Sequence, residues 1–153
     1  MNKEVLSALE ALCAKREYCV SDIRRKALDR LEGDRDAASE VVESLLADGF
    51  VDDARYASAF AREKASLQGW GPVKIRFQLR MKGVSDADIT AALDEIDSDK
   101  ASARLEKLLE NKWRSLADDP QGRLKLIKFA LSRGYEYSEV EGLVKRITVQ
   151  GQL

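Results

Sequence analysis

Histidine is absent from this chain of 153 residues, and cysteine occurs only at Cys13 and Cys19. Without histidine there can be no Ser-His-Asp or Cys-His nucleophilic site and no histidine-ligated metal. The spacing of the two cysteines matches neither a zinc-binding pair nor a redox Cys-x-x-Cys motif. We interpret both as small core residues in a reducing compartment, with a redox switch as the open alternative.

Long apolar runs are also missing, and none approaches the roughly 18 residues that a membrane-spanning helix needs. The first residues carry no apolar segment of the kind found in signal peptides, so a soluble cytoplasmic protein is expected. No phosphate-binding glycine motif occurs, because the cluster from Gly69 to Pro72 follows no strand pattern. No isolated carboxylate pair stands in an apolar setting either, so an enzyme is the weakest interpretation and no cofactor or metal is expected.

What is present is helical periodicity along nearly the whole chain, which predicts an all-α fold of about nine helices. Four glycines just past periodic stretches are expected at helix C-termini: Gly33, Gly49, Gly83 and Gly134. Gly71-Pro72 and Asp119-Pro120 each place a capping residue before a proline at the first helical position. Ser85 and Ser138, each followed three residues later by an acid, predict capping boxes.

The helices fall into a repeat of about 52 residues. In this register Ile23-Arg24 aligns with Ile75-Arg76 and with Ile127-Lys128, and a one-residue slip aligns Gly83 with Gly134. The prediction is an elongated tandem array of three three-helix repeats, because a unit of this size hardly buries a core alone. The expected bounds are 1–49 for repeat 1, 50–97 for repeat 2 and 98–153 for repeat 3.

A net charge of −1 conceals strong charge patterning along the chain. Residues 55–82 carry seven basic side chains and one acid, a net +6, whereas residues 83–99 carry six acids and no base. Residues 15–30 and 112–133 carry net charges of +3 and +4. The second helix of each repeat is therefore basic and the third helix of repeats 1 and 2 is acidic, a surface that can steer a charged partner.

The helix expected to begin at Pro72 has two apolar stripes, one of Val73, Phe77 and Met81 and one of Ile75 and Leu79. We expect this helix to lie between two neighbours, with its charged seams at the edges of grooves. Phe60, Phe77 and Phe129 have core-like spacing, whereas Trp70 lies between two glycines and is a candidate interface anchor.

The basic seams supply the candidate contact residues for an acidic partner. The alternative is that these charges are merely solvated or pair with the acidic helices, although isolated surface pairs contribute little stability. The strongest candidates are Arg76 and Arg80, then Lys74 and Lys82, with weaker equivalents at Arg24, Arg25, Lys125 and Lys128.

The middle of the chain resembles a known family. The pattern Asp53-x-Arg55-Tyr56-Ala57-x-x-Phe60-x-Arg62 precedes Gly69-x-Gly71-Pro72-x-x-Ile75-x-x-x-Leu79-x-x-Lys82-Gly83-Val84. Together these residues look like the signature of the bacterial RecX family. Leu9-x-x-Leu12, Arg16-x-Tyr18 and Arg24-Arg25-Lys26 are similar to the N-terminal region of that family.

The resemblance implies an all-helical regulator that binds the RecA–DNA nucleoprotein filament, typically in its helical groove. Such proteins inhibit or modulate ATP hydrolysis, strand exchange and coprotease activity, with direct contact to single- or double-stranded DNA an open question. A monomer is expected. Within the motif, Gly69, Gly71 and Pro72 are expected to set the start of the basic helix, and Asp53 and Tyr56 to serve as cap and packing residues.

Two other function classes remain open. One is a tandem helix-turn-helix module that binds DNA as a transcription regulator, although the acidic helix after the basic one in repeats 1 and 2 would repel phosphates. Binding to one specific DNA sequence would favour it. The other is a helical scaffold, which salt-insensitive binding through apolar contacts would favour.

Overall fold

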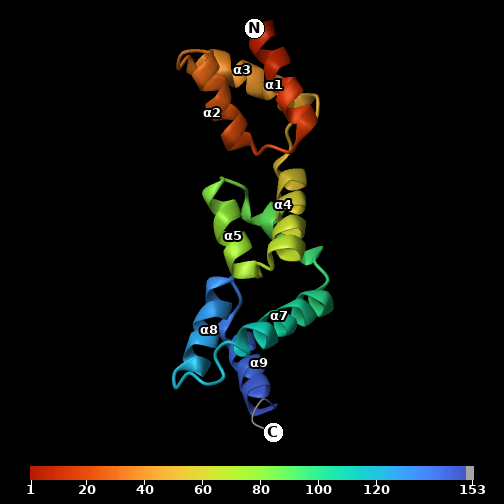
Figure 1. The fold of residues 1–153 in the computed structure, drawn as a ribbon. Helices are drawn as coiled ribbons and strands as arrows, with labels where there is room; N and C mark the ends of the chain where they lie inside the picture. Colours follow the sequence, from red (N-terminus) through yellow and green to blue (C-terminus); the bar gives the residue numbers. More distant parts are fainter. Residues whose placement is uncertain (151–153) are drawn as a thin grey trace. The chain divides into compact units, whose positions relative to one another are not determined.

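Nine α-helices and no strand form residues 1–150, the part of the chain that this computed structural model describes (Figure 1). The predicted all-α class is confirmed. No helix in this part is both long and apolar enough to cross a membrane. The helices are α1 (Lys3–Lys15), α2 (Val20–Arg30), α3 (Arg35–Ala47), α4 (Asp53–Gln68), α5 (Pro72–Met81), α6 (Asp86–Asp94), α7 (Ser98–Trp113), α8 (Gly122–Ser132) and α9 (Tyr137–Gln150).

Short polar side chains begin most of these helices. A side-chain oxygen of Asn2, Asp34, Asp52 and Asp97 accepts a hydrogen bond from a backbone N–H in the first turn of α1, α3, α4 and α7, respectively. The predicted cap Ser85 does the same for α6, accepting from the N–H of Asp88 at 3.2 Å. Pro72 is the first residue of α5, as predicted.

Two predicted helix starts are wrong. The helix after Asp119-Pro120 begins only at Gly122, because Asp119 closes a turn of its own: its Oδ1 accepts from the N–H of Gln121 at 2.8 Å. Ser138 is not a cap, because α9 already begins at Tyr137. The carbonyl of Glu136 accepts the N–H of Val140 there, so the helical bonds begin before the serine.

All four glycines predicted at helix ends have positive φ, between 76° and 92°. The N–H of Gly33 bonds back to the carbonyl of Leu28, and the N–H of Val84, after Gly83, bonds back to the carbonyl of Leu79. These bonds satisfy carbonyls that the end of a helix leaves without partners.

The described chain divides into two compact units, each built from two stretches of sequence. The first unit contains residues 1–60 and 79–92, and the second contains residues 61–78 and the chain from residue 93 onward. The helices α4 and α5 therefore each contribute residues to both units.

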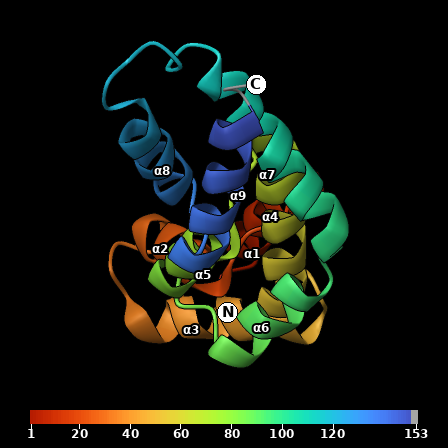
Figure 2. The ribbon, with the colours of Figure 1, turned by 90° about the horizontal axis from the view of Figure 1, so that it is seen from below.

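Each unit has an apolar core of its own. In the first unit, buried residues of α1, α2 and α3 such as Leu9, Ile23 and Leu45 form one cluster. In the second, Leu105, Leu126 and residues of α9 form another, where α7, α8 and α9 lie side by side (Figures 1 and 2). Each fully buried Leu or Ile contributes about 1.5–3 kcal/mol to folding, so such a cluster holds three amphipathic helices together.

A joint in the first unit connects the start of α2 to the turn after α5. The Ser21 hydroxyl donates to the carbonyl of Lys82 at 2.6 Å, and Lys82 Nζ lies 3.0 Å from Asp22 Oδ2. Asp53 contributes from α4, because its Oδ1 accepts the N–H of Val20 at 2.8 Å. The predicted capping role of Asp53 is thus confirmed, but the helix that it caps is α2 and not its own.

A joint of the same design occurs in the second unit, between the start of α5 and the turn after α8. The N–H of Gly71 donates to the carbonyl of Arg133 at 2.7 Å, and the N–H of Val73 donates to the carbonyl of Gly134 at 2.9 Å. A Cβ on Gly71 would overlap the carbonyl of Gly134, and one on Gly134 would overlap Lys74. Two glycines therefore face each other because no side chain fits between these backbones.

The positions of fully buried residues give the spacing between equivalent helices. Ile75 and Leu79 are fully buried in α5, as Ile23 and Ala27 are in α2, which matches the predicted spacing of 52. In α8 the fully buried pair is Leu126 and Ala130, so the spacing from α5 to α8 is 51. With this spacing Gly71 corresponds to Gly122, and both are buried glycines.

Candidate partner-binding surface

The joint with the turn after α8 holds the first turn of α5, and α5 carries the main candidate residues. Its Ile75 and Leu79 have no exposed surface. At about 100° per residue, the side of the helix opposite to them carries Val73, Phe77 and Met81. These three side chains are 45%, 59% and 70% exposed.

The predicted placement of Phe77 in the core is wrong, and so is the predicted burial of α5 on two sides. Only the face of Ile75 and Leu79 is packed, and the apolar stripe of Val73, Phe77 and Met81 lies on the surface. Phe60 and Phe129 are half-buried, and Phe129 packs against the α7–α9 core. We call the stripe of Val73, Phe77 and Met81 the Phe77 face.

Basic side chains flank the Phe77 face, and α5 contains no acidic residue. Arg76 and Lys74 are half-buried, and neither forms a salt bridge with another described residue. Arg80 is exposed and its Nε donates to Asp86 Oδ1 at 2.9 Å, at the start of the acidic helix α6. This pair is solvated on both sides, so it contributes little stability and can be exchanged for a partner.

Trp70 is half-buried between two lysines. Lys64 Nζ lies 4.9 Å and Lys74 Nζ 4.3 Å from the ring centroid, within the range of cation–π attraction. The ring thereby fixes the position of the Lys74 ammonium, whose side chain projects from the first turn of α5. Trp70 was proposed above as an interface anchor; here it lines a pocket in the second unit.

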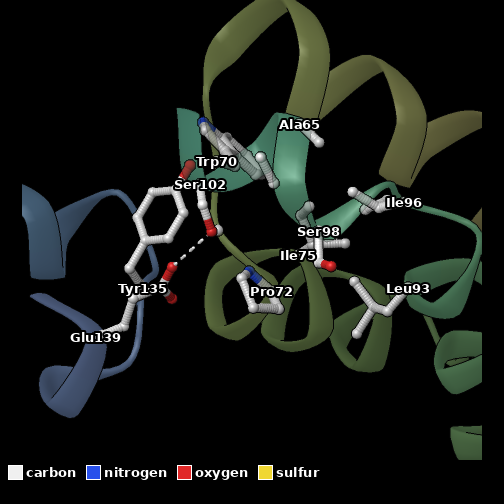
Figure 3. A pocket seen from close by; sticks show the side chains of 12 residues that line it. Ala65, Trp70, Pro72, Ile75, Leu93, Ile96, Ser98, Ser102, Tyr135 and Glu139 are labelled. Carbon is white, nitrogen blue, oxygen red and sulfur yellow. Dashed lines mark hydrogen bonds between the residues drawn. The ribbon is translucent and has the colours of Figure 1, made fainter. Parts of the chain in front are cut away.

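This pocket has a volume of about 180 Å³ and mostly apolar walls. In Figure 3, Trp70, Pro72 and Ile75 line it together with Leu93 and Ile96, while Tyr135 and Glu139 approach from the region of α9. Its Ser102 hydroxyl donates to Glu139 Oε1 at 3.4 Å. Across the described residues, no group of three or more Cys, Asp or Glu side chains is placed to hold a metal ion.

The weaker candidates lie on α2 and α8. Arg24 and Lys128 are exposed. Arg25 pairs with Asp22 at 2.6 Å, and Lys125 pairs with Asp119 at 2.5 Å, so both have intramolecular partners. The Lys125 ammonium, followed by the backbone N–H of Gln121, lowers the pKa of Asp119 below its ordinary value.

Lys82 lies in the joint of the first unit, where it binds Asp22. Partial burial raises the pKa of Asp22, but hydrogen bonds from Lys82 and Cys19 outweigh this effect and leave the pKa below its ordinary value. Because the same carboxylate also holds Arg25, Lys82 and Arg25 share one acid. Lys82 therefore contributes an ion pair within the first unit, in addition to being a candidate contact residue.

Some residues of these joints could not be found by charge or periodicity. Tyr135 is buried, and its hydroxyl donates to the carbonyl of Gly69 at 2.9 Å. Burial raises the pKa of this phenol. Arg55, part of the motif at residues 53–62, binds Glu17 at 2.8 Å and the carbonyl of Gly49 at 3.0 Å. The sequence signal for the joints is that Gly83 and Gly134, which the repeat aligns, each follow the second helix of a repeat.

Comparison with known proteins gives one match to the middle of the chain and others to most of its length. A family model described as "RecX, second three-helix domain" matches residues 52–93. A regulatory protein RecX of Pectobacterium atrosepticum is 30% identical to this chain, over 94% of this chain and 96% of that protein. One of Haemophilus ducreyi is 33% identical, over 84% of this chain and 82% of that protein.

Two solved structures resemble this fold. The crystal structure of RecX from Lactobacillus salivarius superposes with a TM-score of 0.83 at 19% identity, covering 96% of both chains. A second crystal structure of a regulatory protein RecX gives a TM-score of 0.82 at 22% identity, covering 92% of this chain and 70% of that one. At these identities the likeness concerns the fold.

Proposed function

This chain belongs to the RecX family of regulatory proteins, and from that premise we propose that it binds the RecA–DNA nucleoprotein filament and restrains its activity. The restrained activities are ATP hydrolysis, strand exchange and coprotease action. In this role the chain is a non-enzymatic, monomeric regulator that acts in the cytoplasm, in DNA repair, recombination and the SOS response.

The observation that carries this proposal is the match to a RecX protein over nearly the full length of both chains. It covers all three proposed repeats, 1–49, 50–97 and 98–153. The second helix of each proposed repeat contributes basic residues, and α5 contains three bases and no acid. Basic residues on successive repeats suit an extended partner that presents carboxylates or phosphates.

The proposed contact residues are those of the basic seams. Arg76 and Lys74 have no salt-bridge partner in the described chain, and the partner of Arg80 is a solvated carboxylate. Arg76 and Arg80 are therefore available to an acidic surface with little loss of internal contacts, whereas Lys74 also contacts the Trp70 ring. Arg24 and Lys128 are exposed bases on α2 and α8 that can add contacts. Arg25, Lys82 and Lys125 would have to leave or share their present partners.

The test is the rate of ATP hydrolysis by a RecA recombinase on single-stranded DNA, with and without substoichiometric amounts of this protein. Binding to the same DNA alone is measured in parallel at two salt concentrations. We expect hydrolysis to fall at protein concentrations that hardly bind naked DNA. Unchanged hydrolysis together with tight, salt-dependent binding to naked DNA would replace the proposal by a DNA-binding module.

A further inference from the structure

The Phe77 face of α5 is an apolar surface with a basic border. Val73, Phe77 and Met81 lie one turn apart on the helix, and none is less than 45% exposed. Single exposed apolar side chains are ordinary on protein surfaces. Three on successive turns of one helix form a continuous stripe, which folding leaves in water although burial would be favourable.

The composition of this face is typical of a protein-binding surface. Aromatic residues, Met and Arg are the side chains enriched at the centres of protein interfaces. The Phe77 face has Phe77 at its centre, with Arg76 and Arg80 along one edge of the stripe and Lys74 on the other. Val73 and Met81 are aliphatic and cannot stack on a nucleic acid base, so a protein partner fits this face better than a single strand does.

The neighbouring helix α8 shows the same combination within the second unit. Its exposed Leu124 and Leu131 are seven residues apart, and exposed Lys128 lies between them on the same face. The end of α8 is joined to the start of α5 through the backbone bond between Gly134 and Val73. Apolar side chains with interspersed bases thus occur on both helices that meet at this joint.

We propose that the Phe77 face docks onto an acidic protein surface that carries an apolar groove, on a recombinase subunit of the filament. This inference rests on the proposed function. Phe77 enters the groove, and Arg76 and Lys74 pair with carboxylates at its rim. In this arrangement the apolar contact supplies affinity for the filament over naked DNA, because a phosphate backbone has no groove that accepts the ring.

The experiment compares the variant Phe77→Ser with the matched control Leu67→Ser. Leu67 is a 79% exposed apolar residue on α4, so both variants remove a large exposed side chain. Affinity is measured for filaments assembled beforehand on single-stranded DNA and for the same DNA without recombinase, at two salt concentrations. Circular dichroism and thermal unfolding verify that both variants fold.

We expect Phe77→Ser to weaken filament binding at least about tenfold, with little change for Leu67→Ser. Binding to naked DNA and the salt dependence of filament binding should stay as in the unaltered chain. Arg76→Gln should instead reduce that salt dependence, because it removes a charge.

Three results would overturn the inference. The first is filament binding by Phe77→Ser equal to that of the unaltered chain. The second is an equal loss of naked-DNA binding, which would place the ring on nucleic acid bases. The third is failure of the unaltered chain to bind filaments, which would also overturn the proposed function. In the first two results that function survives, because the unaltered chain still binds.

Discussion

Gly134 combines two separate constraints on its replacement by another residue. Its φ of +92° strains any other residue, and its Cα faces backbone atoms of Lys74 closely enough that an added Cβ would lie 2.6 Å from the amide nitrogen. Gly33, in the turn after α2, has a φ of +83°, but an added Cβ there meets nothing within 4 Å. Replacing Gly33 therefore tests backbone strain alone, whereas replacing Gly134 tests backbone strain together with steric overlap.

Gly134→Ala should destabilise the chain more than Gly33→Ala. Both substitutions place alanine at positive φ, which costs about 1–2 kcal/mol. Gly134→Ala also forces the joint with α5 apart, which adds about 1–3 kcal/mol. The free energies of unfolding in urea give the comparison. Equal losses for the two variants would mean that the close contact between the two turns does not stabilise the fold.

Asp53 is half-buried, and this burial raises the pKa of its carboxyl, although the N–H of Val20 acts to lower the pKa. The neighbouring charges of Asp88 and Asp52 raise it further. Because the folded pKa lies above the unfolded one, the contribution of this group to stability decreases as pH rises from about 3.8 through the folded pKa. Its charge is therefore a small cost of folding at neutral pH.

Asp53→Asn keeps an oxygen that can accept from Val20 and removes the charge. We expect it to match or slightly exceed the unaltered chain in melting temperature at pH 7, with this difference disappearing below pH 3.8. Asp53→Ala should lose about 1 kcal/mol at both pH values, because it removes the cap of α2. A melting temperature for Asp53→Asn as low as that of Asp53→Ala would show that the carboxylate charge itself is needed.

At the scale of the element, α5 combines one packed face with an open face that carries most of the candidate residues. The charge of α5 could be predicted from the sequence, and so could its first residue, because Gly71-Pro72 is a local signal. Only one of its two apolar stripes faces the core, although the sequence predicted that both would. Ile75 and Leu79 are packed, but periodicity alone cannot tell an apolar stripe that meets a neighbour from one that meets solvent. For this reason Phe77 was misplaced.

The helix starts at residues 120 and 138 show the same limit. An Asp-Pro pair suits a turn as well as a first helical turn, and only the hydrogen bond from Gln121 to Asp119 decides between the two. The joints were beyond prediction from periodicity altogether. Their contacts are made by backbone groups of Gly71, Arg133 and Gly134, which are far apart in sequence and leave no pattern of polarity.

The basic residues of α5 give a prediction for the helix as a whole. Replacing Arg76 and Arg80 together by Glu should weaken filament binding roughly tenfold or more, because two attractive charges become repulsive. The helix content should stay unchanged, since neither side chain is fully buried. The matched control is the same double change at Lys100 and Lys107, two exposed bases on α7. Normal filament binding by the Arg76/Arg80 variant with native helicity would remove α5 from the proposed interface.

For the whole molecule, the opposing charges of residues 55–82 and 83–99 invite a hypothesis about selectivity. Acids such as Asp86, which binds Arg80, limit attraction to free DNA. Replacing Asp86, Asp88 and Asp94 by Lys should raise affinity for naked DNA more than affinity for the filament. The ratio of the two affinities is the readout. If it stays constant, the acidic residues do not set the preference.

Both joints connect an earlier repeat to the next one in the same way, and this bears on self-association. In each, the start of a second helix docks on the turn after the second helix of the next repeat. Such a head-to-tail contact uses two different surfaces, so it could join one molecule to the next in an open chain unless one of the two surfaces is blocked. In α8, Gly122 corresponds to Gly71. Its Cα is packed against the carbonyl of Leu116 in the same chain, so the start of α8 is not free to dock on another molecule. The chain should therefore sediment as a single species whose mass does not rise with concentration, and a rise in mass would show that this block is ineffective.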